Sequence, residues 1–285
     1  GKQAAAIKDE DFVDHLFVAN THDYILCFSN RGRVYWIKVY EVPQGSRNSR
    51  GKPIVNMFPL EEGEKINAIL PVKEFAQDRY IFMATSQGTV KKTPLSEFSN
   101  PRKAGIIAVA LDEDDYLIGA EITNGENDIV LVSDIGRAVW FDEEDVRPMG
   151  RPARGVRGMK LGKGQQVLSL LVADNDQQTV LVATENGFGK RTALADFRHS
   201  GRGTQGVMAI KASDRNGKVV AAKLVTDEDE IMLITTGGVL IRTRVSEIRE
   251  LGRATQGVTL ISLDSGEKLA GLEKIVETDD DAEEA

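Results

Sequence analysis

The segment Ile231-Met232-Leu233-Ile234-Thr235-Thr236-Gly237-Gly238-Val239-Leu240-Ile241 decides the fold, because a short turn separates two strand-forming apolar runs. Bulky apolar side chains favour extended backbone, and Gly at the end of the turn accepts a positive φ angle that other residues resist. The pattern predicts a β-hairpin. An apolar run that ends in Ser or Thr, with Gly three residues later, occurs five times, at Ser29–Gly32, Thr85–Gly88, Ser133–Gly136, Thr184–Gly187 and Thr235–Gly238.

These hairpins belong to a longer repeat. The hairpin glycines are 56, 48, 51 and 51 residues apart, and a second set of glycines in basic, turn-rich segments keeps nearly the same spacing. This second set is Gly51, Gly105, Gly155, Gly206 and Gly257. A further strand is predicted to begin near Leu16, Ile66, Leu117, Val167, Val219 and Leu269. About four strands in each unit of roughly 50 residues is the size of a propeller blade, so we expect one all-β domain in which successive blades bury a common core.

The numbers of predicted lead strands and hairpins do not match. Six lead strands are predicted but only five hairpins, and the last lead strand, from Leu269, runs on towards an acidic tail. We therefore expect an incomplete last blade, whose hairpin lies upstream of Gly1 in a longer protein. The domain is assigned to residues 1–276. The tail, 277–285, is predicted to be disordered, and it either solubilises the protein or folds back on basic segments.

Composition excludes several classes of protein. The 285 residues contain one cysteine, Cys27, and three scattered histidines, so we expect neither a disulfide framework nor a metal site. No apolar run is long enough to span a bilayer, and a reducing, cytoplasmic location is predicted. The net charge is −8, but the tail accounts for −6 of it, which leaves −2 for residues 1–276. The total charge is therefore uninformative about partners, and the position of each charge matters more.

Bases recur at fixed places in each unit, after the hairpin glycine and around the second glycine. Copies of a unit around a ring would place these bases at equal radii and form a positive belt, which attracts a polyanion through phosphate contacts without reading sequence. The alternative is that they are solvated loop and edge-strand charges. The candidate DNA-binding residues are Arg31, Arg33, Lys38, Arg47, Arg50, Lys52, Lys91, Lys92, Arg102, Lys103, Arg137, Arg154, Arg157, Lys190, Arg191, Arg202, Arg242, Arg244 and Arg253.

Motifs that would indicate catalysis are incomplete. The run Gly201-Arg202-Gly203-Thr204-Gln205-Gly206 matches a dinucleotide fingerprint but lacks its strand-to-helix setting, and the run 186–192 is not a phosphate-binding loop. No nucleophile is paired with His22, and Cys27 is expected to be a buried hydrophobe. Trp36 and Trp140, each four residues after a hairpin glycine, are expected to pack in strands, although stacking on a nucleic acid is the alternative. No catalytic residue and no cofactor are predicted.

Several stretches resemble the C-terminal domain of bacterial DNA gyrase A over essentially the whole chain. These are residues 16–29 and 31–35, Gly88-Thr89-Val90-Lys91-Lys92-Thr93, Gly187-Phe188-Gly189-Lys190-Arg191-Thr192 and Arg242-Thr243-Arg244-Val245-Ser246-Glu247-Ile248. The resemblance implies a six-bladed β-pinwheel, in which neighbouring blades share strands. It also implies that double-stranded DNA wraps around a basic perimeter with positive handedness, which directs the enzyme towards negative supercoiling.

The same resemblance implies a non-catalytic part of an ATP-dependent type IIA topoisomerase, whose cleavage tyrosine lies elsewhere in gyrase A. The implied partners are the rest of gyrase A and the gyrase B protein, in the bacterial cytoplasm and nucleoid, and the isolated domain is expected to be a monomer. The family's Q-R-R-G-G-K-G box is absent from this sequence, which begins Gly1-Lys2. Two alternatives therefore stay open. One is a topoisomerase IV-type pinwheel that binds DNA without full wrapping, and the other is a propeller-like protein-interaction scaffold.

Overall fold

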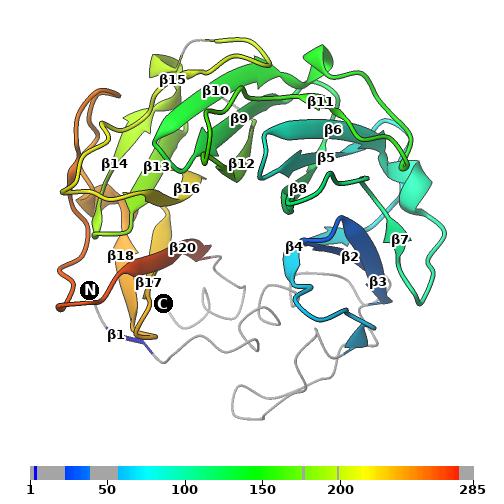
Figure 1. Ribbon diagram of the computed structural model, residues 1–285, viewed down its shortest axis with the longest axis horizontal. Coiled ribbons are helices and arrows are strands. Elements are labelled where there is room, and N and C mark those ends of the chain that lie inside the picture. Colours follow the sequence, from blue (N-terminus) through cyan, green and yellow to red (C-terminus); the bar gives the residue numbers. More distant parts are fainter. Residues whose placement is uncertain (1–2, 5–22, 39–56, 175–176, 198, 276–285) are drawn as a thin grey trace.

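All five predicted turns join antiparallel strands in the computed structural model, which describes residues 3–4, 23–38, 57–174, 177–197 and 199–275 (Figure 1). The hairpin glycines have φ angles from 76° to 89°, as the turn requires. We number the blades 1 to 5 in the chain order of their hairpins. These are β2 (Tyr24–Ser29) and β3 (Arg33–Lys38), β5 (Tyr80–Thr85) and β6 (Thr89–Pro94), β9 (Asp128–Ser133) and β10 (Arg137–Asp142), β13 (Thr179–Thr184) and β14 (Phe188–Ala193), and β17 (Glu230–Thr235) and β18 (Leu240–Arg244).

A third, inner strand follows each hairpin and pairs with the hairpin's first strand. In blade 1, for example, Leu26 lies opposite Leu70 in an antiparallel ladder. The inner strands are β4 (Ile66–Val72), β8 (Leu117–Thr123), β12 (Val167–Ala173), β16 (Val219–Val225) and β20 (Leu269–Ile275). Five of the six predicted lead strands are thus confirmed, and the one predicted near Leu16 lies outside the described residues.

The fourth, outer strand of a blade comes from a different unit. β7 follows the hairpin of blade 2 but pairs with β3 of blade 1, where Ile107 lies opposite Arg33. The outer strands of blades 1 to 4 are β7 (Ile106–Ile107), β11 (Val156–Arg157), β15 (Val207–Met208) and β19 (Val258–Thr259). In blade 5 the N-terminal strand β1 (Gln3–Ala4) occupies this position beside β18. Each sheet therefore has four strands, and neighbouring units exchange one of them.

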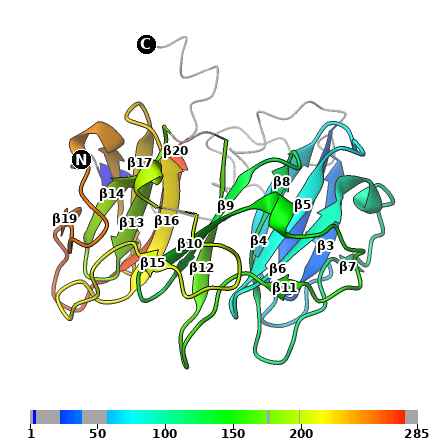
Figure 2. The ribbon, with the colours of Figure 1, turned by 90° about the horizontal axis from the view of Figure 1, so that it is seen from above.

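The five sheets follow one another around a central axis. Figure 1 shows the inner strands towards the middle and the outer strands β7, β11 and β15 towards the outside. The edge view in Figure 2 shows that β4 of blade 1 and β20 of blade 5 stand apart. A short 3₁₀-helix follows the second hairpin strand of blades 2 to 5: η3 (Leu95–Phe98), η4 (Glu143–Asp145), η5 (Leu194–Asp196) and η6 (Val245–Glu247). None of the helices in the described ranges has the length and apolar character needed to cross a membrane.

The core lies between successive blades. Each of the four largest clusters of buried apolar residues joins two adjacent sheets. The ring centres of Phe28 in blade 1 and Phe98 after blade 2 are 5.9 Å apart, and those of Phe82 in blade 2 and Phe141 in blade 3 are 6.3 Å apart. In blades 1 to 4 both faces of the sheet are covered, so the central strand is buried nearly throughout rather than at alternate positions. Residues 25–28 accordingly have no exposed surface. In blade 5 buried and partly exposed residues alternate along β17.

The prediction of six blades, with the last one incomplete, is wrong. The described residues form five blades, and the fifth has four strands in the order β1-β18-β17-β20. Sequence periodicity finds a lead strand in each unit but does not say whether it pairs with the hairpin before it or after it. In the structure it pairs with the hairpin before it, so β20 completes blade 5 and does not begin a sixth. The four-stranded blade and the exchange of strands between neighbours are both observed.

A substitution at Gly206 would test how closely an outer strand approaches the hairpin of the preceding blade. It has a φ angle of 75°, and a Cβ atom there would lie 2.2 Å from the Ala138 carbonyl oxygen. We expect Gly206→Ala to lower the free energy of unfolding by about 3 kcal/mol, because left-handed backbone strain and a clash add together. Gly164→Ala is the matched control, since Gly164 has a φ angle of 77° but open space around it. It should cost about 1 kcal/mol in urea unfolding, and equal effects would contradict this explanation.

Candidate nucleic-acid interface

The second-glycine segments run along the outside of the blades. Each begins after a 3₁₀-helix and ends at the two-residue outer strand that pairs with the preceding blade. We call the four described segments, residues 99–107, 147–157, 200–208 and 249–259, the rim loops. The first three contain no acidic residue, and the fourth contains one, Glu250. From Arg147 to Lys163 there are six bases and no acid, so positive charge is concentrated at the rim although the chain is acidic overall.

Some predicted bases are exposed on the rim loops. Arg102, Lys103, Arg154, Arg157 and Arg202 are exposed, and Arg253 is partly so. Two of them also link one loop to the next around the rim. The Arg202 guanidinium donates to the Arg157 carbonyl at 2.7 Å, and that of Arg253 donates to the Met208 carbonyl at 3.2 Å. Each of these arginines therefore lies against the outer strand of the neighbouring blade.

The arginines directly after two hairpin glycines brace the rim loops from behind. The Arg33 guanidinium donates to the Ala104 carbonyl at 3.3 Å, and that of Arg137 donates to the Gly206 carbonyl at 2.7 Å. In blade 4 this position is Phe188, and Arg215 takes over the contact. Arg215 lies 4.2 Å from the centre of the Phe188 ring and donates to the Gly257 carbonyl at 3.1 Å. Sequence analysis missed Arg215, because it comes from the turn before an inner strand, outside the repeating basic positions.

Four of the predicted DNA-binding bases are buried and not on the rim surface. Lys91, Lys92, Lys190 and Arg191 are at most 7% exposed. They are two adjacent pairs in the sequence, and segments from other parts of the chain cover them, as where the Lys91 ammonium donates to the Ala108 carbonyl and the Lys92 ammonium to the Glu143 carbonyl. A buried side chain cannot reach a phosphate, so these four residues are not part of the interface that the structure presents.

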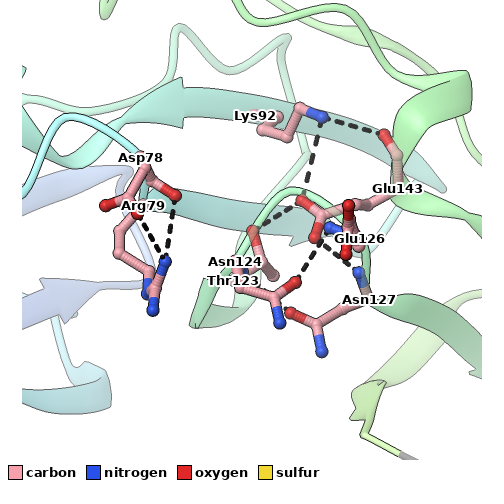
Figure 3. Close-up of polar contacts among 8 residues, drawn as sticks. All are labelled: Asp78, Arg79, Lys92, Thr123, Asn124, Glu126, Asn127 and Glu143. Atoms are coloured by element: carbon pink, nitrogen blue, oxygen red, sulfur yellow. Dashed lines mark hydrogen bonds and ion pairs between the residues drawn. The ribbon is translucent and has the colours of Figure 1, made fainter.

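The buried Lys92 faces a buried carboxylate across blades 2 and 3. Its ammonium lies 3.7 Å from Glu143 Oε2 and donates to the Glu143 carbonyl at 3.1 Å (Figure 3). The Glu143 carboxylate has no exposed surface and also accepts from Thr123 Oγ1 at 2.7 Å and from the Asn127 N–H at 2.8 Å. In blade 4, Arg191 occupies the equivalent place, donates to the Ile248 carbonyl at 2.7 Å and pairs with Asp227.

Other predicted bases are exposed or half-buried but engaged by nearby groups. Arg242 and Arg244 pair with Glu230, and Arg154 pairs with Asp112. Arg31 donates to the Glu62 carbonyl at 3.2 Å, and the Lys38 ammonium lies 5.6 Å from the centre of the Tyr24 ring. Surface pairs of this kind contribute little stability and exchange partners readily. The remaining candidates, Arg47, Arg50 and Lys52, lie outside the described residues.

The two tryptophans pack between blades. Trp36 donates its indole N–H to the Phe98 carbonyl at 2.8 Å, and the Trp140 ring is buried and lies 4.4 Å from the His199 ring. These are the positions that Lys92 and Arg191 occupy in blades 2 and 4, so in blades 1 to 4 the position is an interblade contact. In blade 5 it is Arg242, which is exposed and pairs with Glu230 of the same hairpin. Packing in the strands is thus confirmed. Cys27 is also buried as expected, and burial raises the pKa of its thiol to about 12.

The candidate dinucleotide-binding motif lacks the strand-to-helix setting in the structure. The 201–206 run is a turn that leads into the two-residue strand β15, with no helix after it. His22 lies outside the described residues. In the described part of the chain, one group brings possible metal ligands together, namely Asp128, Asp142 and His199 on the surface of blade 3. His199 Nε2 lies 3.3 Å from Asp128 Oδ1, and the hydrogen bond between the two carboxyl groups raises the pKa of Asp142.

Comparisons with known proteins agree with this geometry. A family model described as DNA gyrase C-terminal domain, beta-propeller, matches residues 23–73, 79–124, 127–174, 178–226 and 229–275, which correspond to the five blades. The DNA gyrase A protein from Klebsiella oxytoca is 54% identical over 283 residues, and that from Escherichia coli is 53% identical over 281. Each alignment covers 99% of this chain and 32% of the relative, so the chain spans about a third of these proteins.

Solved structures show the same architecture. The C-terminal domain of DNA topoisomerase IV superposes with a TM-score of 0.84 at 28% identity, over 90% of this chain and 80% of that one. The DNA gyrase A C-terminal domain superposes with a TM-score of 0.77 at 30% identity, over 90% of this chain and 84% of that one.

Removing the carboxylate of the buried Lys92–Glu143 pair, between blades 2 and 3, is expected to lower the stability of the protein strongly. Glu143→Ala removes the carboxylate that faces the Lys92 ammonium, which keeps only the backbone carbonyl of residue 143. It also leaves the Asn127 N–H and the Thr123 hydroxyl without this acceptor in the interior, so the free energy of unfolding should fall by about 3 kcal/mol. Glu144→Ala is the control, because Glu144 is exposed in the same 3₁₀-helix and should change stability by less than about 0.5 kcal/mol. Urea unfolding of both variants measures this difference. A loss below about 1 kcal/mol for Glu143→Ala would mean that the carboxylate is not needed for the interblade contact.

The buried lysines predict a pH dependence. Desolvation lowers the pKa of Lys91 and of Lys190 to about 8, whereas an unfolded lysine titrates near 10.4. Between these values the unfolded chain binds more protons, so the free energy of unfolding rises with pH, by at most about 1.4 kcal/mol per pH unit for each lysine. Urea unfolding from pH 7 to pH 10 should show this rise in the wild type relative to a Lys91→Met/Lys190→Met variant. The comparison cancels the opposite contribution of Cys27, and a difference that does not change with pH would contradict the prediction.

Proposed function

The chain belongs to the DNA gyrase C-terminal domain family, and we propose that it binds double-stranded DNA along its rim, without sequence preference, and wraps it with positive handedness. The observation that supports this proposal is the repeated rim loop, which carries exposed arginine and lysine residues on the outside of successive blades. Contacts from such side chains to phosphates release counterions and carry no base information. The exposed members of this set are Arg102, Lys103, Arg147, Arg154, Arg157, Arg202 and Arg249.

The rim curves, so a bound duplex must bend. Bending DNA through half a turn over about 40 base pairs costs on the order of 10 kcal/mol by elastic estimates. Roughly 6–10 phosphate contacts can offset this cost at low salt. Surface ion pairs such as Arg154–Asp112 do not prevent it, because a phosphate can replace an exposed carboxylate at little cost.

Wrapping gives the domain its role in the longer protein. A positively wrapped segment is presented to the strand-passage gate, and this biases the enzyme towards negative supercoiling. The domain itself contributes DNA geometry and no catalytic group or cofactor, and the cleavage tyrosine lies in the other part of gyrase A. Its partners are DNA, the rest of gyrase A and the gyrase B protein, in the bacterial cytoplasm and nucleoid.

A second candidate function follows from the structural comparison. The topoisomerase IV domain has the higher TM-score of the two neighbours described above, although it is slightly lower in identity. On this alternative the domain binds and bends DNA without a complete handed wrap. DNA topology distinguishes the two functions, since bending alone stores no linking difference.

We expect a positive linking-number shift when a relaxing topoisomerase acts on plasmid to which the chain is bound. The shift should grow with the ratio of protein to DNA until the plasmid is saturated, because each wrapped segment stores a fixed positive writhe. Plasmid relaxed without the chain is the control. Binding with no shift would favour the topoisomerase IV-type function, and absence of binding at 50 mM salt would contradict both.

Affinity should fall steeply with salt, by about 10³–10⁵ between 50 and 200 mM. Replacing both Arg102 and Lys103 with Glu should weaken binding at least about tenfold and lower the salt slope by about 2, since up to two phosphate contacts are lost. Lys73→Glu is the control, because Lys73 is exposed directly after inner strand β4, away from the rim. Titration of a labelled duplex at several salt concentrations measures both quantities. If Lys73→Glu weakened binding as strongly, the charges would act through the net charge and not through the rim.

A further inference from the structure

Two lysines lie inside the rim at equivalent places in blades 2 and 4. Lys91 and Lys190 each stand three residues after a hairpin glycine, on β6 and β14. Their exposed fractions are 1% and 0%. No carboxylate oxygen of the described residues lies within 4 Å of either ammonium, so their charge is met by neutral oxygens.

Lys190 is surrounded by the backbone of one rim loop. Its ammonium lies 2.6 Å from the Gly252 carbonyl oxygen, 2.5 Å from that of Arg253 and 2.9 Å from that of Thr255, and Thr255 Oγ1 is 3.0 Å away. An ammonium has three N–H donors, so all of them are used within residues 252–255. Arg253, one of the predicted DNA-binding residues, is held through its own backbone.

Lys91 makes the corresponding contacts in blade 2. Its ammonium donates to the Ala108 carbonyl at 2.8 Å and to the Arg151 carbonyl. Ala108 directly follows the first rim loop and Arg151 lies within the next, so the side chain connects the ends of adjacent loop segments. The loop that contains Arg151 also carries Arg154 and Arg157.

The fold itself does not require a lysine at this position. Blades 1, 3 and 5 form the same hairpin with Tyr35, Val139 and Ile241 there. Burial of a charged ammonium is unfavourable, as the lowered pKa values of Lys91 and Lys190 indicate. An apolar residue would avoid this cost but would leave several loop carbonyls without a donor. The lysines therefore act on the conformation of the loops more than on the stability of the sheet.

We propose that Lys91 and Lys190 are positioning residues, whose buried ammonium groups hold rim loops 147–157 and 249–259 in the shape that presents their arginines to DNA phosphates. This inference rests on the proposed function, because it assigns the loops to DNA binding. Neither lysine touches DNA. Rim loop 200–208, next to blade 3, is held in another way. The Ser200 N–H donates to the Trp140 carbonyl at 3.0 Å, and Arg137 donates to the Gly206 carbonyl.

Lys190→Met tests the proposal, because Met keeps a long unbranched side chain and loses every donor. Limited digestion of the whole chain with trypsin reports each loop separately. We expect cleavage after Arg253 to become about tenfold faster, since the loop opens more often, while cleavage after Arg202 is unchanged because blade 3 has Val139 at the equivalent position. Affinity for a labelled duplex at 100 mM salt should fall about threefold to tenfold, in line with the loss of one or two positioned phosphate contacts.

Two further variants complete the experiment. Lys73→Met removes an exposed lysine away from the rim and should leave cleavage and affinity unchanged. Lys190→Gln restores N–H donors without charge and should recover part of the protection after Arg253. If thermal unfolding shows that the Lys190→Met variant has lost its cooperative transition, the Lys190→Gln variant takes its place in the experiment.

The outcomes separate two claims, that Lys190 holds the rim loop and that the held loop binds DNA. Unchanged cleavage after Arg253 in both Lys190 variants would overturn the positioning role. Faster cleavage with unchanged DNA affinity would show that the lysine holds the loop but that the held shape is not used for DNA. Failure of the wild type to bind DNA would contradict the proposed function instead, and the digestion would still decide whether Lys190 holds the loop.

Discussion

The exchange of one short strand between neighbouring units is the constraint on which the rest of the structure depends. An unpaired sheet edge is a hazard, and each hairpin leaves its second strand exposed at the outside of the blade. In blades 1 to 4 two residues from the following unit cover that edge, as where Ile106 and Ile107 pair with Val34 and Arg33. In blade 5 the N-terminal strand β1 covers it. To supply the outer strand of blades 1 to 4, the chain passes from one blade back to the preceding one, so each connecting loop lies along the rim.

The same exchange explains why the charge distribution matters more than the net charge. Apart from their two-residue outer strands, the rim loops lie outside the sheets and contribute few side chains to the core. They can therefore carry bases freely, whereas acids gather in the turns that lead into the inner strands, as at Glu61–Glu64 and Asp112–Asp115. A chain with a net charge of −8 thus presents a basic rim.

Polar groups inside the ring fix how one blade sits on the next. Lys92 reaches Glu143, and Arg191 reaches the Ile248 carbonyl, each across an interface that is otherwise apolar. Such contacts add little net stability, because desolvation opposes them, but they are directional and allow few alternative arrangements. The five blades consequently share one architecture while differing in the residues that join them.

The amino-acid sequence by itself determined the hairpins, five inner strands and the basic loops, because these follow from local rules. Apolar runs form strands, glycine permits the turn, and a repeat of about 50 residues implies equivalent positions. Only the tertiary structure decided how many blades result and which bases reach the surface. Lys91 and Arg102 look alike in the sequence, but the Arg151 carbonyl, 60 residues further on, covers the first and not the second. Burial of a side chain depends on a neighbour brought in from the next unit, and no local pattern records that neighbour.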